Sequence, residues 1–284
     1  MLTVLNALKK TTEFLEKKGI ESARVNAEIM LAHILKCKRL QLYLSFDRPL
    51  NDNEKNLYRE FLLRRINHEP VQYITGNVDF YGLDFQVNSS VLIPRPETEI
   101  LVETIIKNTN VNNETNILDI GTGSGNIAIS LAKHLPNSKI TAIDKSKEAL
   151  IIAVKNSELN NVKERINFIE NDILNDQKIF DNVFDIVVSN PPYVSKEEYK
   201  NLEPELNKYE PSIALTDFSD GTIFYNSISN QVKNFLNTNG KLFFELGAGQ
   251  SKIVKEFMEQ NNFYNIQIIK DYQNHDRVIW GTLI

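Results

Sequence analysis

The chain has 284 residues, of which 42% are hydrophobic and 24% charged, so its length suffices for one sizeable α/β domain and a smaller one. Its single cysteine, Cys37, excludes a disulfide framework and a cysteine zinc site, and its four histidines lack ligand spacing, so no bound metal is expected. The net charge of −5 shows no excess of basic residues, which proteins that bind duplex DNA usually have, so we expect no contact with duplex DNA. Neither a secretory signal nor an apolar run of membrane-spanning length is found, so we expect a cytoplasmic protein that does not contact a membrane.

Helical periodicity dominates the first part of the chain. Apolar residues recur at three- and four-residue steps, which predicts helices over residues 2–18, 22–36 and 52–67, with a short turn at 40–44. Each helix has an apolar face that must be buried against its neighbours. We therefore expect a small helical bundle as a first domain over residues 1–72.

A β-hairpin is expected next, because residues 77–87 alternate and Tyr81-Gly82 is a probable turn. It would form a linker over residues 73–92. Pro94 and Pro96 then mark the entry to a helix that runs toward Asn108. From residue 117 onward apolar strands alternate with helices, and the strands are expected at 117–120, 139–143, 166–169, 184–188, 241–246, 263–269 and 277–283. Seven such strands predict a doubly wound α/β domain over residues 93–284, with a mostly parallel sheet covered on both faces.

A glycine loop follows the first of these strands. Residues 121–125 read Gly-Thr-Gly-Ser-Gly and precede apolar residues at helical spacing, so the backbone can turn tightly and approach a ligand at a helix N-terminus. Asp144 ends the second strand, where a doubly wound fold places an acceptor for ribose hydroxyls. A loop that only packs a strand against a helix is the less favoured interpretation.

The loop favours a nucleoside ligand without phosphates. Its Gly-x-Gly-x-Gly spacing differs from the pyrophosphate-binding pattern of nicotinamide dinucleotide sites, and it contains no Arg or Lys. A P-loop is excluded, because no Lys-Ser or Lys-Thr pair follows Gly125. S-adenosylmethionine is the cofactor that fits best.

The motif Asn190-Pro191-Pro192-Tyr193 follows the fourth strand and indicates chemistry on an amide-like nitrogen. Such a nitrogen is a poor nucleophile, and a catalyst must hold both of its N–H bonds to aim the lone pair at an electrophile. The Asn190 oxygen and the Pro191 carbonyl are the expected acceptors, because consecutive prolines stiffen the backbone and carry no competing N–H. Tyr193 offers a flat wall for a planar group. On its own the motif is equally compatible with a simple turn.

The two motifs are expected to meet. Ligands of doubly wound sheets bind at the carboxyl ends of the strands, beside the point where the strand order reverses. The glycine loop follows the first strand and Asn190 follows the fourth, and these two strands are neighbours at that point. The active site is therefore expected between them.

Taken together, these motifs resemble the HemK/PrmC family, bacterial enzymes that methylate the side-chain N5 of glutamine in peptide chain release factors. The resemblance is nearly full length, and its most specific parts are Ile-Pro-Arg-Pro-Glu-Thr-Glu at 93–99 and Tyr-Glu-Pro at 209–211. It also covers residues 69–76, 121–125 with Asp144, 189–193, 212–215, 220–221, 245–247 with Gln250, and 276–278.

The resemblance implies a class I S-adenosylmethionine-dependent methyltransferase behind a helical domain that docks the release factor. Its target would be the glutamine of the Gly-Gly-Gln motif. Asn190 and Pro191 would be catalytic, and residues 190–193 would frame the substrate. The residues implied for the cofactor are Gly121, Thr122, Gly123, Ser124, Gly125, Asp144, Ile173 and Asn190.

The chain departs from the family pattern at two places. Relatives commonly carry an aromatic residue where this chain has Ile173, so adenine would meet an aliphatic wall, or Ile173 would only pack in the core. Residues 216–219 read Thr-Asp-Phe-Ser, where relatives often have a pair of glycines before Asp220-Gly221. The family makes pocket lining by Arg95, Glu97 and Glu99 somewhat more probable than a charge cluster at a helix start, whereas Glu210 and Pro211 either cap the active-site loop or end a helix.

Three alternatives remain open. An adenine-N6 DNA methyltransferase uses a similar motif but must extrude its base and grip the duplex, which the low sequence pI disfavours. A glutamine methyltransferase acting on a ribosomal protein would differ only in docking. A non-enzymatic binding module is disfavoured by Asn190 and the intact glycine loop.

Overall fold

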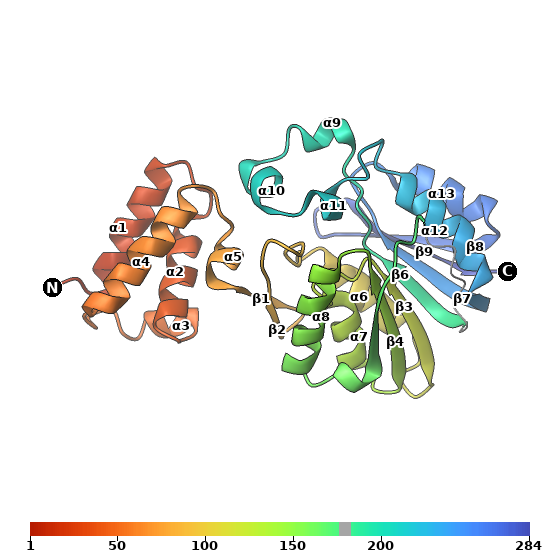
Figure 1. The fold of residues 1–284 in the computed structure, drawn as a ribbon, viewed down its shortest axis with the longest axis horizontal. Coiled ribbons are helices and arrows are strands. Elements are labelled where there is room, and N and C mark those ends of the chain that lie inside the picture. Colours follow the sequence, from red (N-terminus) through yellow and green to blue (C-terminus); the bar gives the residue numbers. More distant parts are fainter. Residues whose placement is uncertain (176–182) are drawn as a thin grey trace. The chain divides into compact units, whose positions relative to one another are not determined.

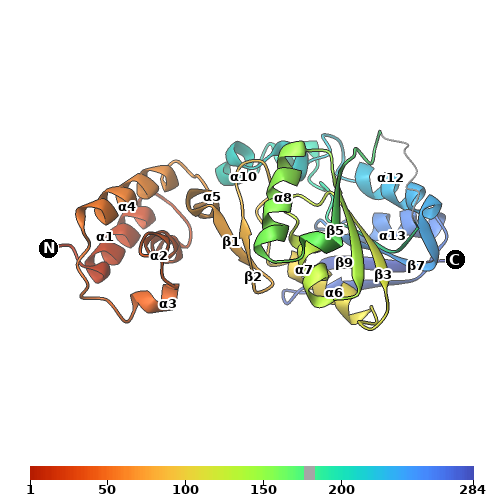
Figure 2. The same cartoon turned by 60° about the horizontal axis from the view of Figure 1, so that its bottom comes forward.

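The computed structural model describes residues 1–175 and 183–284 (Figures 1 and 2). Contacts divide the chain into two compact units, one of residues 1–77 and 203–209 and one of residues 78–202 and 210–284. The domain boundaries expected at residues 72 and 92 stay predictions.

The first unit is a helical bundle, as the periodicity predicted. Its helices are α1 (Val4–Lys17), α2 (Ala23–Ile34), α3 (Arg39–Leu42), α4 (Asp52–Arg65), α5 (Val71–Thr75) and α10 (Pro204–Tyr209). Their apolar faces meet in one core that includes Leu8, Leu15, Met30 and Leu31. The turn expected at 40–44 is confirmed only in part: residues 39–42 form the short helix α3, whose Leu42 is fully buried, and the turn follows at 43–44.

Two buried charges hold this bundle together. Glu28 is 2% exposed, and its carboxylate accepts hydrogen bonds from Arg24 at 2.5 Å, from Arg39 at 2.8 Å and from the Tyr43 hydroxyl at 2.6 Å. Arg65 is also buried and forms an ion pair with Glu205 of α10. A buried charge needs such partners to offset its loss of hydration.

The second unit starts with the expected hairpin, β1 (Asn77–Phe80) and β2 (Leu83–Gln86). Its turn is confirmed, because Tyr81 and Gly82 have φ of 52° and 72°, the left-handed pair of a tight hairpin turn. Phe80 and Phe85 are buried and join the main core.

A seven-stranded sheet forms the centre of this unit in the described residues, and the predicted α/β class is confirmed. Its order is β5-β4-β3-β6-β7-β9-β8, and β9 alone pairs antiparallel, with β7 and β8. The first and fourth strands of the sheet, β3 and β6, are parallel neighbours, as expected. The strands are β3 (Thr115–Ile120), β4 (Ser138–Asp144), β5 (Ile166–Glu170), β6 (Phe184–Ser189), β7 (Leu236–Glu245), β8 (Phe263–Lys270) and β9 (Asp276–Leu283).

Helices cover both faces of the sheet (Figure 1). On one face Ile117 and Phe243 pack with α6 and α7; on the other Leu118 and Phe244 pack with α12 and α13. This alternation follows from the two-residue period of a strand. The helices of this unit are α6 (Thr98–Lys107), α7 (Asn126–His134), α8 (Lys147–Leu159), α9 (Lys196–Tyr199), α11 (Ser212–Leu215), α12 (Ile223–Gln231) and α13 (Ser251–Gln260), with 3-10 turns η1 (Lys163–Arg165) and η2 (Val232–Asn234).

The start of β7 differs from the expectation. The strand begins at Leu236, whereas the sequence predicted a start at residue 241. The prediction was late because Asn-Thr-Asn-Gly at 237–240 has the composition of a turn. Residues 237–240 nevertheless belong to the strand, because Leu236 pairs with Phe184 of β6 and the register shifts before Ile186 pairs with Lys241. In the part of the chain that the structure describes, no helix is long and apolar enough to cross a membrane.

Candidate functional site

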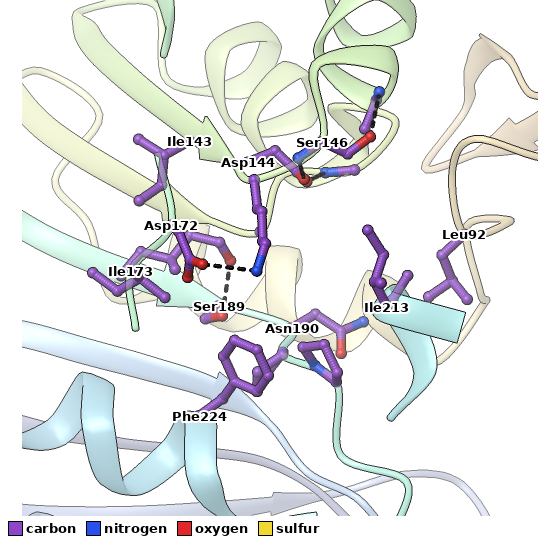
Figure 3. A pocket seen from close by; sticks show the side chains of 18 of the residues that line it. Leu92, Ile143, Asp144, Ser146, Asp172, Ile173, Ser189, Asn190, Ile213 and Phe224 are labelled. Carbon is purple, nitrogen blue, oxygen red and sulfur yellow. Dashed lines mark hydrogen bonds and ion pairs between the residues drawn. The ribbon is translucent and has the colours of Figure 1, made fainter. Parts of the chain in front are cut away.

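A cavity opens at the carboxyl ends of β3, β4 and β6 (Figure 3). Its empty volume is about 880 Å³, part of which is open to solvent. Of the residues predicted for the site, those that line it are Gly121, Gly123, Asp144, Ile173, Asn190, Pro191 and Pro192. The predicted meeting of the glycine loop with the Asn-Pro-Pro segment is therefore confirmed.

The glycine loop is fixed to β4 and its end. The backbone N–H groups of Gly121 and Thr122 both donate to the Ile143 carbonyl at 2.9 Å, and the Gly123 N–H donates to Asp144 Oδ2 at 2.8 Å. Gly121 and Gly123 have φ of 75° and 55°, a region that side chains disfavour. The loop can therefore bring bare backbone against a ligand.

Asp144 lies at the rim of the loop with its carboxylate oriented. Its Oδ1 accepts the Ser146 N–H at 2.8 Å, and its Oδ2 accepts that of Gly123. Burial raises its pKa, and the backbone N–H groups partly counter that rise. Each carboxylate oxygen keeps a lone pair, which is what two ribose hydroxyls would need.

The remaining wall of the cavity is mostly apolar. Ile143, Ile173, Leu174 and Phe224 all line it, and Ile173 is also part of the core, so both of its expected roles are compatible with the structure. The Lys145 ammonium at the rim is paired with Asp172 at 2.8 Å. These walls fit a purine and a ribose without phosphates.

Asn190 projects into the same space from the end of β6 (Figure 3). The Ser189 hydroxyl donates to the Ile120 carbonyl at 2.8 Å and ties this strand end to the glycine-loop strand. The Asn190 amide nitrogen donates to Thr98 Oγ1 at 3.3 Å, which directs the amide oxygen away from Thr98. The oxygen is then available to accept a hydrogen bond in the cavity.

Four predicted residues do not line the cavity in the described structure: Thr122, Ser124, Gly125 and Tyr193. Gly125 precedes α7 and lies so close to Ile129 and Ala153 that a Cβ there would be 2.9 Å from Ile129 Cδ1. The Tyr193 ring packs against the second sheet-face core. Its framing of a substrate stays a prediction.

The charged residues around 93–99 support the site from outside. Arg95 pairs with buried Glu210 at 2.5 Å, and Glu99 accepts the Tyr81 N–H at 2.8 Å. None of Arg95, Glu97 and Glu99 lines this cavity in the described residues, and their lining of a pocket stays a prediction. Pro211 lines the cavity and also follows the end of α10 at Tyr209, so both expected roles of this segment are compatible with the structure.

A brace that the sequence did not reveal holds the carbonyl of Tyr193. The Gln250 side-chain nitrogen donates to the Tyr193 carbonyl at 2.9 Å and to the Gly221 carbonyl at 3.3 Å. The space between is narrow, because a Cβ on Gly221 would lie 2.2 Å from the Tyr193 oxygen. This arrangement fixes the backbone directly after the two prolines.

Two buried carboxyls accompany the site. Burial raises the pKa of Asp119, at the end of β3, to about 7, although the Thr122 hydroxyl donates to it at 2.6 Å. Burial also raises the pKa of Glu245, at the end of β7, to about 7. In the sequence both are acidic residues at the end of an apolar strand pattern, and Glu245 also belongs to the segment 245–247 of the family resemblance.

The geometry suits group transfer to a nitrogen. It combines a phosphate-free nucleoside cavity with an amide oxygen that can accept an N–H. Neither a nucleophilic cysteine nor a histidine lines the cavity in the described residues. Alignment of two bound reactants is thus the chemistry that this arrangement offers.

Comparisons with known proteins agree with this geometry. Residues 6–76 match the family model described as the PrmC N-terminal domain, and residues 96–206 match the methyltransferase small domain. The chain is 42% identical to a release factor glutamine methyltransferase of Fusobacterium nucleatum over 97% of this chain and 77% of that one. It is 40% identical to one of Chlorobaculum tepidum over 97% and 95%. Among solved structures, a methyltransferase from Pyrococcus furiosus has a TM-score of 0.52 at 19% identity, over 82% of this chain and 98% of that one, which shows a shared fold.

Proposed function

The chain belongs to the family of release factor glutamine methyltransferases, and on this premise we propose that it methylates the side-chain N5 of the glutamine in the Gly-Gly-Gln motif of a peptide chain release factor. S-adenosylmethionine is the proposed methyl donor. The observation that carries the proposal is the Asn190 amide, whose nitrogen is held by Thr98 while the side chain lies in the cavity beside the glycine loop.

The cofactor would lie along the glycine loop. Gly121 and Gly123 present bare backbone, Asp144 would accept the ribose hydroxyls, and Ile173 with Phe224 would flank the adenine. When bound, S-adenosylmethionine supplies an electrophilic methyl group on a sulfonium, and the departing thioether is neutral. No strong base is therefore required for the transfer itself, and the methylated nitrogen would lose one proton to solvent afterwards.

The substrate nitrogen would be oriented by two acceptors. We propose that Asn190 Oδ1 and the Pro191 carbonyl each accept one N–H of the glutamine carboxamide, so that its lone pair is aimed at the methyl carbon. These hydrogen bonds strengthen as the nitrogen gains positive charge, and thus favour the transition state over the ground state. Alignment of reactants can lower a barrier by about 7–11 kcal/mol in favourable cases.

The first unit is proposed to dock the release factor, and its match to the PrmC N-terminal domain supports this role. A cytoplasmic location is proposed for the same reason, since release factors act at the ribosome. The protein substrate would bring its glutamine to the cavity of the second unit.

A labelling experiment tests the proposed reaction. The purified protein is incubated with methyl-labelled S-adenosylmethionine and, in separate reactions, with a release factor, ribosomal proteins or duplex DNA. We expect label on the Gly-Gly-Gln glutamine, and none on the same factor with that glutamine replaced by alanine. Label only on a ribosomal protein, or only on DNA adenine, would overturn the proposal.

Asn190→Ala tests the assignment of the catalytic residue. Loss of one pre-oriented hydrogen bond to developing charge typically lowers kcat by about 10²–10³-fold. We expect a loss of this size, with a dissociation constant for S-adenosylmethionine that changes by less than about threefold, because binding and transition-state contacts are separable. Turnover is measured by label transfer and binding by calorimetry, and equal losses in both would contradict the assignment.

A further inference from the structure

The orientation of the Asn190 side chain decides whether it can act. An amide presents an acceptor oxygen on one side and two N–H donors on the other, and a half-turn exchanges them. Only the orientation with Oδ1 toward the cavity can accept an N–H from a substrate amide. The enzyme therefore needs a device that keeps the N–H side turned away.

Two buried side chains lie on that N–H side. The Thr98 hydroxyl, at the start of α6 and 1% exposed, accepts the Asn190 Nδ2–H at 3.3 Å. Glu245, 2% exposed, follows Phe244 on β7, and the register partner of Phe244 on β6 is Ser189, so the Glu245 carboxylate lies beside the Asn190 amide and the Thr98 hydroxyl. In the described residues neither Thr98 nor Glu245 lines the cavity, so neither can touch a bound ligand there.

We propose that Glu245 is a positioning residue for methyl transfer, which together with Thr98 locks the Asn190 amide with its oxygen toward the cavity. This inference rests on the proposed function. An ionised carboxylate suits the task because it only accepts hydrogen bonds, so it attracts N–H groups and repels an amide oxygen. A neutral glutamine at residue 245 could bond to Asn190 in either orientation.

The position of Glu245 is costly for stability, which argues against a purely structural role. Its Oε2 is buried and makes no hydrogen bond within the described part of the chain. An incompletely bonded buried carboxylate destabilises the fold relative to a neutral side chain of the same shape. A residue that served only packing would be better neutral.

Protonation should release the lock. Burial raises the pKa of Glu245 to about 7, against the opposing effects of the Thr98 hydrogen bond and the Arg277 charge. The other ionisable groups that face it are Glu97, Tyr193 and Tyr225. Below pH 7 the carboxyl gains an O–H that can donate to Asn190 Oδ1, and the amide can then turn its oxygen inward.

The variant Glu245→Gln tests the proposal. We expect kcat to fall about tenfold, the effect of one lost buried hydrogen bond, while the dissociation constant for S-adenosylmethionine stays within about twofold. The melting temperature should stay equal or rise, because the buried charge is gone. A residue with only a structural role would instead lower the melting temperature and leave kcat unchanged.

Two threonine variants of α6 provide a matched pair. Thr98→Val removes the hydroxyl that bonds to Asn190 and should also lower kcat without weakening cofactor binding. Thr104→Val removes a hydroxyl that is also buried but bonds to the Ile100 carbonyl of its own helix, at 2.7 Å, and it should leave kcat unchanged.

The pH profile separates this proposal from the proposed function. Wild-type kcat should drop as the pH falls below 7, and this acidic decrease should disappear in Glu245→Gln. An acidic decrease that persists in the variant would overturn the proposal.

If the wild type methylates no release factor, the proposed function fails, but the lock on Asn190 can still be tested by ¹⁵N NMR. The signal of the Asn190 side-chain amide is identified by its loss in Asn190→Ala. It should shift through pH 7 in the wild type and not in Glu245→Gln, and a signal that does not move in the wild type would overturn the lock.

Discussion

At the scale of single residues, Phe224 gives the cavity wall an aromatic side chain, whereas relatives commonly carry one at the position of Ile173. It lies at the start of α12, contacts the second sheet-face core, and lines the cavity (Figure 3). A purine that stacks on an aromatic ring gains about 1–3 kcal/mol. Phe224 can supply that surface although it is 51 residues distant from Ile173 in the sequence.

Phe224→Ala is therefore expected to raise the dissociation constant for S-adenosylmethionine about tenfold, the effect of one lost stacking surface. Turnover at saturating cofactor should change little, since the Asn190 contacts remain. Phe218→Ala is the matched control, because Phe218 is 54% exposed and does not line the cavity in the described residues. Calorimetric titration measures both variants, and equal affinities for them would refute the role of Phe224.

Residues of the site were predictable where the chemistry is local in sequence. Asn190 and Pro191 could be identified from the sequence because both expected acceptors, the Asn190 side-chain oxygen and the Pro191 carbonyl, lie within one motif of four consecutive residues. Thr98 and Glu245 were not, because their roles arise only where β6 and β7 end side by side near the start of α6. No spacing rule in the sequence connects them.

At the scale of elements, the loop before α12 and the loop before α13 together support the proline segment. The Gln250 side chain links the carbonyls of Tyr193 and Gly221, and Gly221 has a φ of 83°. A side chain at residue 221 would be forced against the Tyr193 carbonyl. The position of the Asn-Pro-Pro segment thus depends on a glycine 31 residues after Asn190.

Gly221→Ala should lower both stability and turnover. The left-handed backbone costs about 1–2 kcal/mol for a residue with a side chain, and the contact at 2.2 Å adds displacement of the Tyr193 carbonyl. Gly249→Ala carries the same backbone cost at φ of 77° with nothing within 4 Å of its Cβ. Urea unfolding and kcat are compared, and we expect kcat to fall in Gly221→Ala alone. Similar kcat values in the two variants would exclude the brace.

The elements themselves were predictable where one apolar pattern extended over the whole segment. The seven strands and the hairpin turn at Tyr81-Gly82 follow from alternation and turn chemistry. The start of β7 was missed because its first residues favour a turn and become a strand only by pairing with β6. Tertiary pairing overrides local propensity at such places.

At the scale of the whole molecule, the pKa values of ionisable groups shift in opposite directions in the two units. In the second unit burial raises the pKa of Asp119 and of Glu245 to about 7. In the first unit His33 is exposed overall, and partial burial of its ring lowers its pKa, whereas hydrogen bonds from Tyr43, Arg39 and Arg24 outweigh burial and lower the pKa of Glu28. Each unit has its own core, so each is expected to unfold in its own transition.

The sign of the pH dependence follows from proton binding. Between about pH 4 and 7 the folded second unit binds more protons than its unfolded chain, so its stability decreases as the pH rises, by up to about 1.4 kcal/mol per pH unit for each carboxyl. The unfolded first unit binds the extra proton of His33 below about pH 6.5, so its stability decreases as the pH falls. Glu28 adds to that loss only below about pH 4.5, because its folded pKa is lowered from 4.5.

Calorimetry of the full chain at pH 5 and pH 8 should therefore show two transitions that move in opposite directions. The transition of the second unit should be higher at pH 5, because Asp119 and Glu245 are then protonated and no buried charge has to be maintained. Asp119→Asn removes one of these two groups, so it should reduce that shift by about half and leave the first transition in place. Two transitions that shift in the same direction, or a shift unaffected by Asp119→Asn, would show that other groups control the pH response of this unit.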